Sequence, residues 1–202
     1  MKITNPLFLT FLCAAALTVL GCGQKEPTNL NNHNRTIVAF GDSLTNGNGV
    51  ERDLAYPAVL SQILGRPVVN LGVSGDVSAQ GVARLSEIDE HRPYMVLIEF
   101  GANDILRGMS LERARDNVAQ MTDYVQGRGA IAVIVDTGGA FQMNRYSNLL
   151  KELAHEKNAL FVPGIMDGIY TDSSLKSDNL HPNEKGYEMI ANRVAKVIRP
   201  YL

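Results

Sequence analysis

The feature that most constrains the fold is a regular alternation of short apolar runs with longer segments of helical periodicity. The apolar runs are rich in β-branched residues, and most are followed directly by Gly, as expected for short buried strands that end in turns. These runs predict strands over Ile37–Phe40, Val68–Leu71, Met95–Phe100, Ile131–Asp136 and Leu160–Val162.

The segments between and after these runs carry apolar residues at helical spacing, with Ser, Asn or Gly at their ends. They predict helices over Ala55–Leu64, Ser78–Ile88, Leu111–Gln126, Asn144–Lys157 and Asn183–Ile198. Strands that alternate with helices form a parallel sheet covered on both faces, and right-handed crossovers leave few strand orders. We therefore predict a three-layer α/β/α, flavodoxin-like sandwich with five parallel strands in the order 2-1-3-4-5.

Three polar or small residues follow the ends of the first three predicted strands. Ser43 follows the first strand, Gly75 the second and Asn103 the third. In this strand order the three loops are neighbours at the carboxyl edge of the sheet, where open α/β sheets bind ligands. Position alone leaves two interpretations open, because a Gly-rich loop with a serine suits either a nucleophile or a phosphate site.

A carboxylate and an imidazole stand three residues apart near the end of the chain, in Asp178-Asn179-Leu180-His181-Pro182. A serine hydroxyl needs an adjacent base to act as a nucleophile, and that base needs a third group to orient it. Asp178 and His181 can serve as that pair, which favours Ser43 as a nucleophile. An Asp three positions before a His in a turn can reach back to the ring.

Four ordered segments resemble the blocks of the GDSL esterases, also called SGNH hydrolases. They are Gly41-Asp42-Ser43-Leu44, Val73-Ser74-Gly75-Asp76, Gly101-Ala102-Asn103-Asp104 and Asp178-Asn179-Leu180-His181-Pro182. The resemblance is strongest to the bacterial thioesterase I, lysophospholipase L1 and arylesterase branch. It implies a catalytic triad of Ser43, His181 and Asp178, and an oxyanion hole of Ser43, Gly75 and Asn103. It further implies acyl ester, thioester or lysophospholipid substrates and no cofactor.

Two further features bear on the predicted site. Ile105, Leu106 and Met109 follow Asn103 in a segment that contains Gly108, and we expect these apolar residues to line a pocket for an acyl chain. Glu99 lies inside the third predicted strand, where an unpaired carboxylate is costly. We expect Glu99 to be paired or protonated and to support the site.

The first 34 residues are separate from this domain. A positive start at Lys2 and an apolar run from Pro6 to Leu20 predict a secretory signal peptide over residues 1–21. Gly before Cys22 resembles a lipobox, which implies lipidation of Cys22 and a periplasmic, membrane-anchored protein. The alternative is ordinary signal cleavage with an incidental thiol. Residues 22–34 are expected to form a flexible tether, and residues 35–202 the hydrolase domain.

Composition and motifs argue against two classes of function, nucleic-acid binding and zinc-dependent hydrolysis. The net charge of −2 gives the chain no excess of Lys and Arg of the kind that nucleic-acid binding requires. His155-Glu156-Lys157-Asn158-Ala159 lacks the second histidine of a zinc protease helix, so no metal site is predicted.

Two alternatives to an esterase of the thioesterase and lysophospholipase branch remain open. One is an O-acetyl esterase acting on carbohydrate or peptidoglycan. The other is a non-catalytic, flavodoxin-like module that binds phosphate or flavin, which leaves Asp178 and His181 without a role. The oligomeric state is not predicted.

Overall fold

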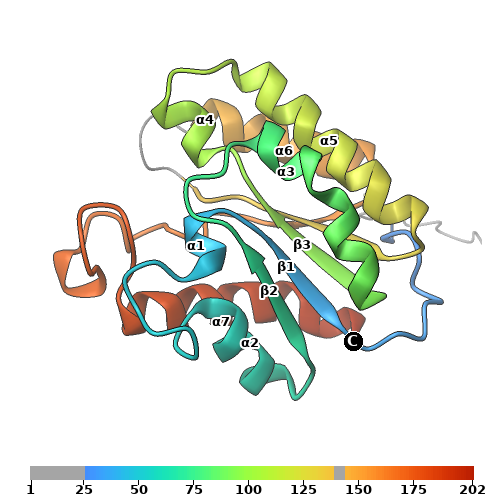
Figure 1. The fold of residues 1–202 in the computed structure, drawn as a ribbon, viewed down its shortest axis with the longest axis horizontal. Helices are drawn as coiled ribbons and strands as arrows, with labels where there is room; N and C mark the ends of the chain where they lie inside the picture. Colours follow the sequence, from blue (N-terminus) through green and yellow to red (C-terminus); the bar gives the residue numbers. More distant parts are fainter. Residues whose placement is uncertain (1–25, 139–143) are drawn as a thin grey trace, which may run out of the picture.

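A computed structural model of the chain describes residues 26–138 and 144–202. Within these residues five strands form one sheet: β1 (Ile37–Gly41), β2 (Val68–Gly72), β3 (Met95–Glu99), β4 (Ile131–Val135) and β5 (Leu160–Val162). Neighbouring strands are all parallel, and their order is β2-β1-β3-β4-β5 (Figure 1). The predicted fold class and strand order are confirmed.

Helices cover both faces of the sheet (Figure 1). One face carries α2 (Tyr56–Leu64) and α7 (Glu184–Ile198), and the other carries α3 (Ser78–Ala83), α5 (Leu111–Gly127) and α6 (Asn144–Glu156). Alternation along β1 divides its side chains between the two layers, because successive residues of a strand point to opposite faces. Ile37 and Ala39 pack with α2 and α7. Val38 and Phe40 pack with α5 and α6.

Two short helices stand where loops were expected. These are α1 (Ser43–Asn46), directly after β1, and α4 (Ala102–Leu106), directly after β3. Asp42 caps α1 by accepting a hydrogen bond from the Leu44 N–H, and Gly47 ends the helix in the left-handed conformation. Ser43 therefore lies in the first turn of a short helix, and the expectation of a loop serine was wrong.

The helix predicted over Ser78–Ile88 is divided. Its α-helical part ends at Ala83, and a 3₁₀ helix, η1 (Leu85–His91), follows. Arg84 stands at the junction with φ −114° and ψ 21°, which is outside the helical region. Two further 3₁₀ turns are η2 (Ser173–Leu175) and η3 (Arg199–Tyr201).

Part of the expected tether lies against the domain. Asn29 Nδ2 donates to the carbonyls of Gln126 and Ala130, and Asn32 Nδ2 donates to those of Pro93 and Gly129. These amides satisfy carbonyl groups at the end of α5 and in the loops before β3 and β4, which holds this segment in place. The predicted signal peptide (1–21) and lipidation site (Cys22) lie outside the described residues.

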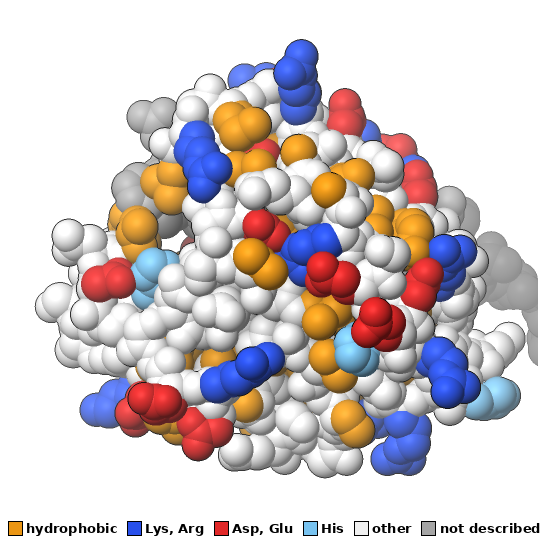
Figure 2. Space-filling view, in the orientation of Figure 1, with side chains coloured by type: hydrophobic (Ala, Val, Ile, Leu, Met, Phe, Trp, Pro, Cys, Tyr) orange, Lys and Arg blue, Asp and Glu red, His pale blue; other side chains and the backbone are white. Residues whose placement is uncertain are grey.

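The surface carries charges of both signs. On the face in Figure 2, Lys and Arg side chains are interspersed with Asp and Glu and do not gather into a basic stripe. Of the helices in residues 26–138 and 144–202, none is long and apolar enough to span a bilayer.

Candidate active site

The carboxyl edge of the sheet brings the predicted residues together. A cavity of about 270 Å³ opens there, and Ser43, Gly75, Asn103 and His181 all line it. Ser43 begins α1 after β1, Gly75 lies in the turn after β2, and Asn103 lies in α4 after β3. The topology thus places residues that are up to 138 positions apart in sequence around one small space.

Ser43, His181 and Asp178 form a continuous hydrogen-bonded chain. Ser43 Oγ lies 3.0 Å from His181 Nε2, and His181 Nδ1 lies 2.8 Å from Asp178 Oδ2. The loop that carries the last two residues is closed on itself, because the Ser177 N–H donates to the His181 carbonyl at 3.0 Å. Both ring nitrogens of His181 therefore have partners in the geometry that a general base requires.

Asp178 is held as a carboxylate. Its Oδ1 accepts hydrogen bonds from the backbone N–H groups of Leu180 and His181, at 2.7 and 2.8 Å. Partial burial alone raises the pKa of Asp178, but the His181 ring and these two N–H groups together lower that pKa to about 2. A charged Asp178 fixes the orientation of the imidazole and stabilises a positive charge on it.

Gly75 supplies a backbone N–H at the cavity wall. Its φ is +81°, a conformation that residues with a side chain rarely adopt. Within the described part of the chain, no protein atom accepts a hydrogen bond from the N–H of Gly75 or of Ser43. The N–H of Ser43 is free because it lies in the first turn of α1. Both donors are therefore available to a bound oxygen.

The side-chain amide of Asn103 already donates hydrogen bonds to two protein groups, which the sequence did not indicate. Its Nδ2 donates to Asp42 Oδ2 at 2.9 Å and to the Asp76 carbonyl at 3.0 Å. These two bonds fix the amide at the cavity wall and occupy both of its hydrogens. A substrate oxygen would have to share one of them.

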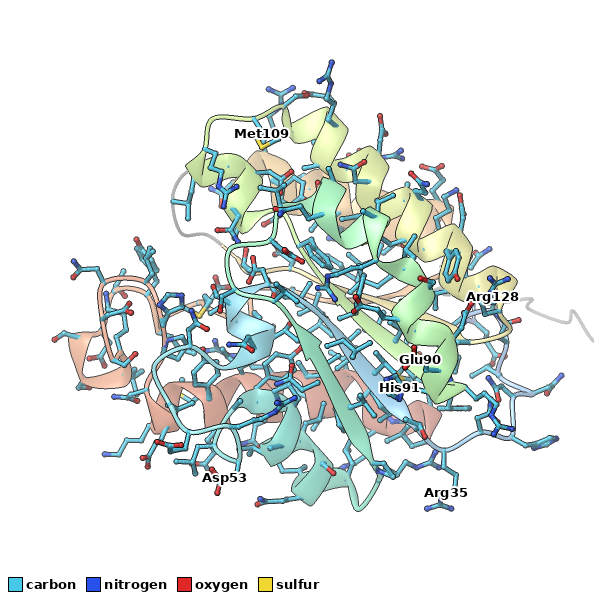
Figure 3. All side chains as sticks on the ribbon, in the orientation of Figure 1. Arg35, Asp53, Glu90, His91, Met109 and Arg128 are labelled. Carbon is cyan, nitrogen blue, oxygen red and sulfur yellow. The ribbon has the colours of Figure 1, made fainter. Side chains whose placement is uncertain are left out.

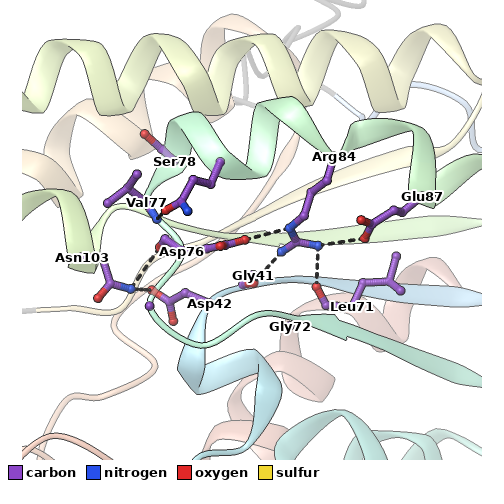
Figure 4. A network of polar contacts seen from close by, with 12 residues as sticks. Gly41, Asp42, Leu71, Gly72, Asp76, Val77, Ser78, Arg84, Glu87 and Asn103 are labelled. Atoms are coloured by element: carbon purple, nitrogen blue, oxygen red, sulfur yellow. Dashed lines mark hydrogen bonds and ion pairs between the residues drawn. The ribbon is translucent and has the colours of Figure 1, made fainter.

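Arg84 connects the ends of β1 and β2 with Asp76 (Figure 4). Its guanidinium donates to the carbonyl of Gly41 at the end of β1, to that of Leu71 in β2, and to the Asp76 carboxylate, at 2.9, 2.9 and 2.7 Å. The guanidinium carbon also lies 4.3 Å from the centre of the Phe40 ring. Sequence reasoning missed Arg84, because no local motif marks an arginine that acts on two strands.

The cavity beside Ser43 is largely apolar. Two of the three residues predicted to line an acyl pocket, Ile105 and Leu106, do line it, together with Leu44, Met166 and Leu180. Met109 does not. The chain turns at Gly108, where φ is +66°. Met109, labelled in Figure 3, lines a separate hollow together with Ser110 and Arg113.

Sequence reasoning also missed part of the cavity wall. Thr137 follows β4, and Met166 and Tyr170 follow β5. The rule that located Ser43, Gly75 and Asn103 applies to these loops as well, because they too leave the carboxyl edge of the sheet. Their residue types alone give no signal for a site.

Of the described histidines, only His181 forms a hydrogen bond with Ser43. His91 ends η1 at the end of the sheet opposite α1 (Figure 3), and His155 lies in the last turn of α6. Among residues 26–138 and 144–202, no group of three or more His, Cys, Asp or Glu side chains is placed to hold a metal ion.

Comparison with known proteins agrees with this geometry. The GDSL-like Lipase/Acylhydrolase family model matches residues 39–189. Thioesterase 1/protease 1/lysophospholipase L1 of Escherichia coli (strain K12) is 30% identical over 174 residues, which cover 82% of this chain and 84% of that protein.

Solved structures share the fold. A crystal structure of TesA matches with a TM-score of 0.78 and 27% identity, over 83% of this chain and all of that one. The structure of AlinE4, an SGNH-hydrolase family esterase, matches with a TM-score of 0.66 and 29% identity, over 85% of this chain and 98% of that one. The chain described here therefore belongs to the GDSL-like lipase/acylhydrolase family, as its four motifs predict.

Proposed function

We propose that this protein is a serine ester hydrolase that cleaves acyl esters through an acyl-enzyme on Ser43. The observation that carries the proposal is the chain of contacts from Ser43 Oγ to His181 Nε2, and from His181 Nδ1 to Asp178. Nucleophile, base and orienting carboxylate are each within hydrogen-bond reach of the next. The family supports the reaction class.

The proposed reaction has two halves. Ser43 Oγ attacks the acyl carbon while its proton passes to His181 Nε2, and the charged Asp178 stabilises the imidazolium. The N–H groups of Ser43 and Gly75, with the amide of Asn103, stabilise the oxyanion of the tetrahedral intermediate. His181 then protonates the leaving alcohol. A water molecule releases the acyl group by the same route in reverse.

The substrate is proposed to be an ester with an apolar acyl chain, such as a lysophospholipid. Ile105, Leu106 and Met166 give the cavity an apolar wall beside Ser43, which suits a hydrocarbon chain. A relative at 30% identity is named as a thioesterase and lysophospholipase. We further propose export to the periplasm with a lipid anchor at Cys22, which would place the enzyme beside its substrates.

A series of p-nitrophenyl esters from acetate to dodecanoate, run beside a lysophospholipid, tests the proposal. We expect turnover that depends on Ser43, disappears in Ser43→Ala and is faster for medium-length acyl chains than for acetate. Turnover of acetate alone would point to an O-acetyl esterase instead. No turnover, with flavin absorbance in the purified protein, would point to a binding module.

A further inference from the structure

Two carboxyl groups are buried directly beneath the nucleophile. Glu99 is the last residue of β3 and pairs in register with Gly41 of β1, and Asp42 stands between Gly41 and Ser43. Glu99 is 0% exposed and Asp42 is 1% exposed. In the described residues neither forms an ion pair with Lys, Arg or His. Two buried carboxylates without a cation cannot both remain charged at a low cost.

The hydrogen bonds assign different roles to the two groups. The Asp42 carboxylate accepts from the Leu44 N–H at 3.1 Å and from Asn103 Nδ2 at 2.9 Å, so that both of its oxygens have donors. Glu99 Oε2 accepts from Thr45 Oγ1 at 3.0 Å. Glu99 Oε1 is buried, and among the described residues it has no hydrogen-bond partner, neither donor nor acceptor. A buried charged oxygen without a donor is costly, and protonation of Glu99 removes that charge.

We propose that Glu99 remains protonated during catalysis and acts, through Asp42 and Asn103, as a positioning residue for the oxyanion hole. The proton of Glu99 is shared with the Asp42 carboxylate, which in turn holds the Asn103 amide at the cavity wall. The inference rests on the proposed function, because the oxyanion forms only in ester hydrolysis.

The surroundings agree with a proton on Glu99. Burial and the neighbouring Asp42 carboxylate raise the pKa of Glu99 well above its usual range. Burial raises the pKa of Asp42 to about 6, although the hydrogen bond from the Leu44 N–H and the interaction with the Glu99 carboxyl oppose that rise. The interaction of the two carboxyl groups raises the pKa of Glu99 and lowers that of Asp42, which favours the proton on Glu99.

The other titratable groups that face the pair do not compete for this proton. Tyr56 of α2, Tyr146 of α6 and Tyr187 of α7 are all buried, and burial raises the pKa of each phenol, so they remain neutral. His181 acts on Asp42 from the cavity side and lowers its pKa. With Glu99 neutral, the pair carries one negative charge, on Asp42.

Loss of the Glu99 proton would impair catalysis for an electrostatic reason. It would put a second negative charge in a dry site, next to the place where the oxyanion develops. It would also leave two carboxylates that repel each other, which disturbs the acceptor that holds Asn103. The second charge raises the free energy of the transition state more than that of the bound ester, because only the transition state carries the oxyanion. The expected effect is therefore on kcat.

The experiment measures kcat against pH from 6 to 10 on a saturating p-nitrophenyl ester, with Ser43→Ala as the blank for spontaneous hydrolysis. In the wild type, kcat should fall at alkaline pH by about tenfold, a fraction of the 10²–10³ lost with a whole oxyanion donor. E99Q keeps a neutral donor of the same shape and should lose this alkaline fall while remaining active. D136N is the matched control, because Asp136 is another buried carboxyl whose pKa is raised by burial. It should keep the fall.

A spectroscopic measurement keeps the test independent of activity and of the folding of any one variant. The infrared spectrum of the wild type at pH 7 should contain a carboxylic acid C=O band that is absent from E99Q and present in D136N. An alkaline fall of equal size in E99Q, or a wild-type spectrum without the Glu99 band, would overturn the inference. If no form hydrolyses the ester, the proposed function fails, and the infrared result still reports on Glu99.

Discussion

Arg84→Met should destabilise this protein far more than an equivalent change at the surface. The Arg84 side chain is 13% exposed and its partner carboxylate on Asp76 is 8% exposed. The substitution leaves Asp76 buried without its cation and removes donors from the carbonyls of Gly41 and Leu71. Removal of one partner from a buried pair costs about 3–5 kcal/mol. In a protein of this size each kcal/mol lowers the Tm by roughly 2–4 °C, so the expected fall is roughly 6–20 °C.

The matched control is Arg128→Met. Arg128 also pairs with a carboxylate, Asp89, at 2.9 Å and also lies over an aromatic ring, that of Tyr124. Its side chain is 52% exposed, so that water replaces the lost contacts and the Tm should hardly change. Thermal unfolding followed by circular dichroism measures both variants. Equal shifts in the two would refute the argument that burial makes the Arg84 contacts strong.

A second variant separates the unpaired charge from the lost packing. Asp76→Asn in the Arg84→Met background removes the buried carboxylate that has lost its cation. The double variant should therefore regain part of the lost Tm. A double variant with a lower Tm than Arg84→Met would show that the uncompensated charge of Asp76 is not the main cost.

Three further predictions concern substrate, anchor and pH. Leu106→Ala should lower kcat/KM for long-chain esters roughly 10–200-fold, which corresponds to roughly 1–3 kcal/mol, and spare acetate. Met109 is similarly exposed but lies outside the cavity, so Met109→Ala should not discriminate between chain lengths. An equal loss for both chain lengths in Leu106→Ala would contradict this. Cys22→Ser should release the full-length protein from membranes or leave it unprocessed, and Cys13→Ser should not; equal fractionation would argue for plain secretion. The raised pKa of Glu99 means that the folded state binds more protons than the unfolded state above the usual value of 4.5. Urea unfolding should therefore show that the free energy of unfolding of the wild type falls as the pH rises from 4.5 towards the raised pKa of Glu99. In E99Q the same free energy should fall less steeply.

The sequence was sufficient to predict the sheet and the residues around Ser43. The alternation of strands and helices sets the strand order, and the order brings the ends of β1, β2 and β3 together. Asp178 and His181 were predictable because their separation of three residues suits a hydrogen bond within one turn. These inferences depend on local patterns and on topology, both of which a single sequence contains.

Other parts of the site depend on contacts between distant segments. Helix α1 forms because Asp42 caps it, yet the same residues also suit a loop. Met166 and Tyr170 reach the cavity from loops without any motif. Met109 was wrongly assigned to the acyl pocket because the turn at Gly108 directs the chain away from it. A sequence pattern does not contain the direction of such a turn.

The central claim is that Ser43 is the nucleophile, and labelling with a fluorophosphonate tests it most directly. Ser74 is the informative rival, because it lies beside Gly75 but is hydrogen-bonded to Asn46 and Asn48 rather than to a histidine. We expect mass spectrometry to find one modified peptide, with the phosphonate on Ser43, and no labelling in His181→Ala. A phosphonate on Ser74, or full labelling of Ser43 without His181, would contradict the account.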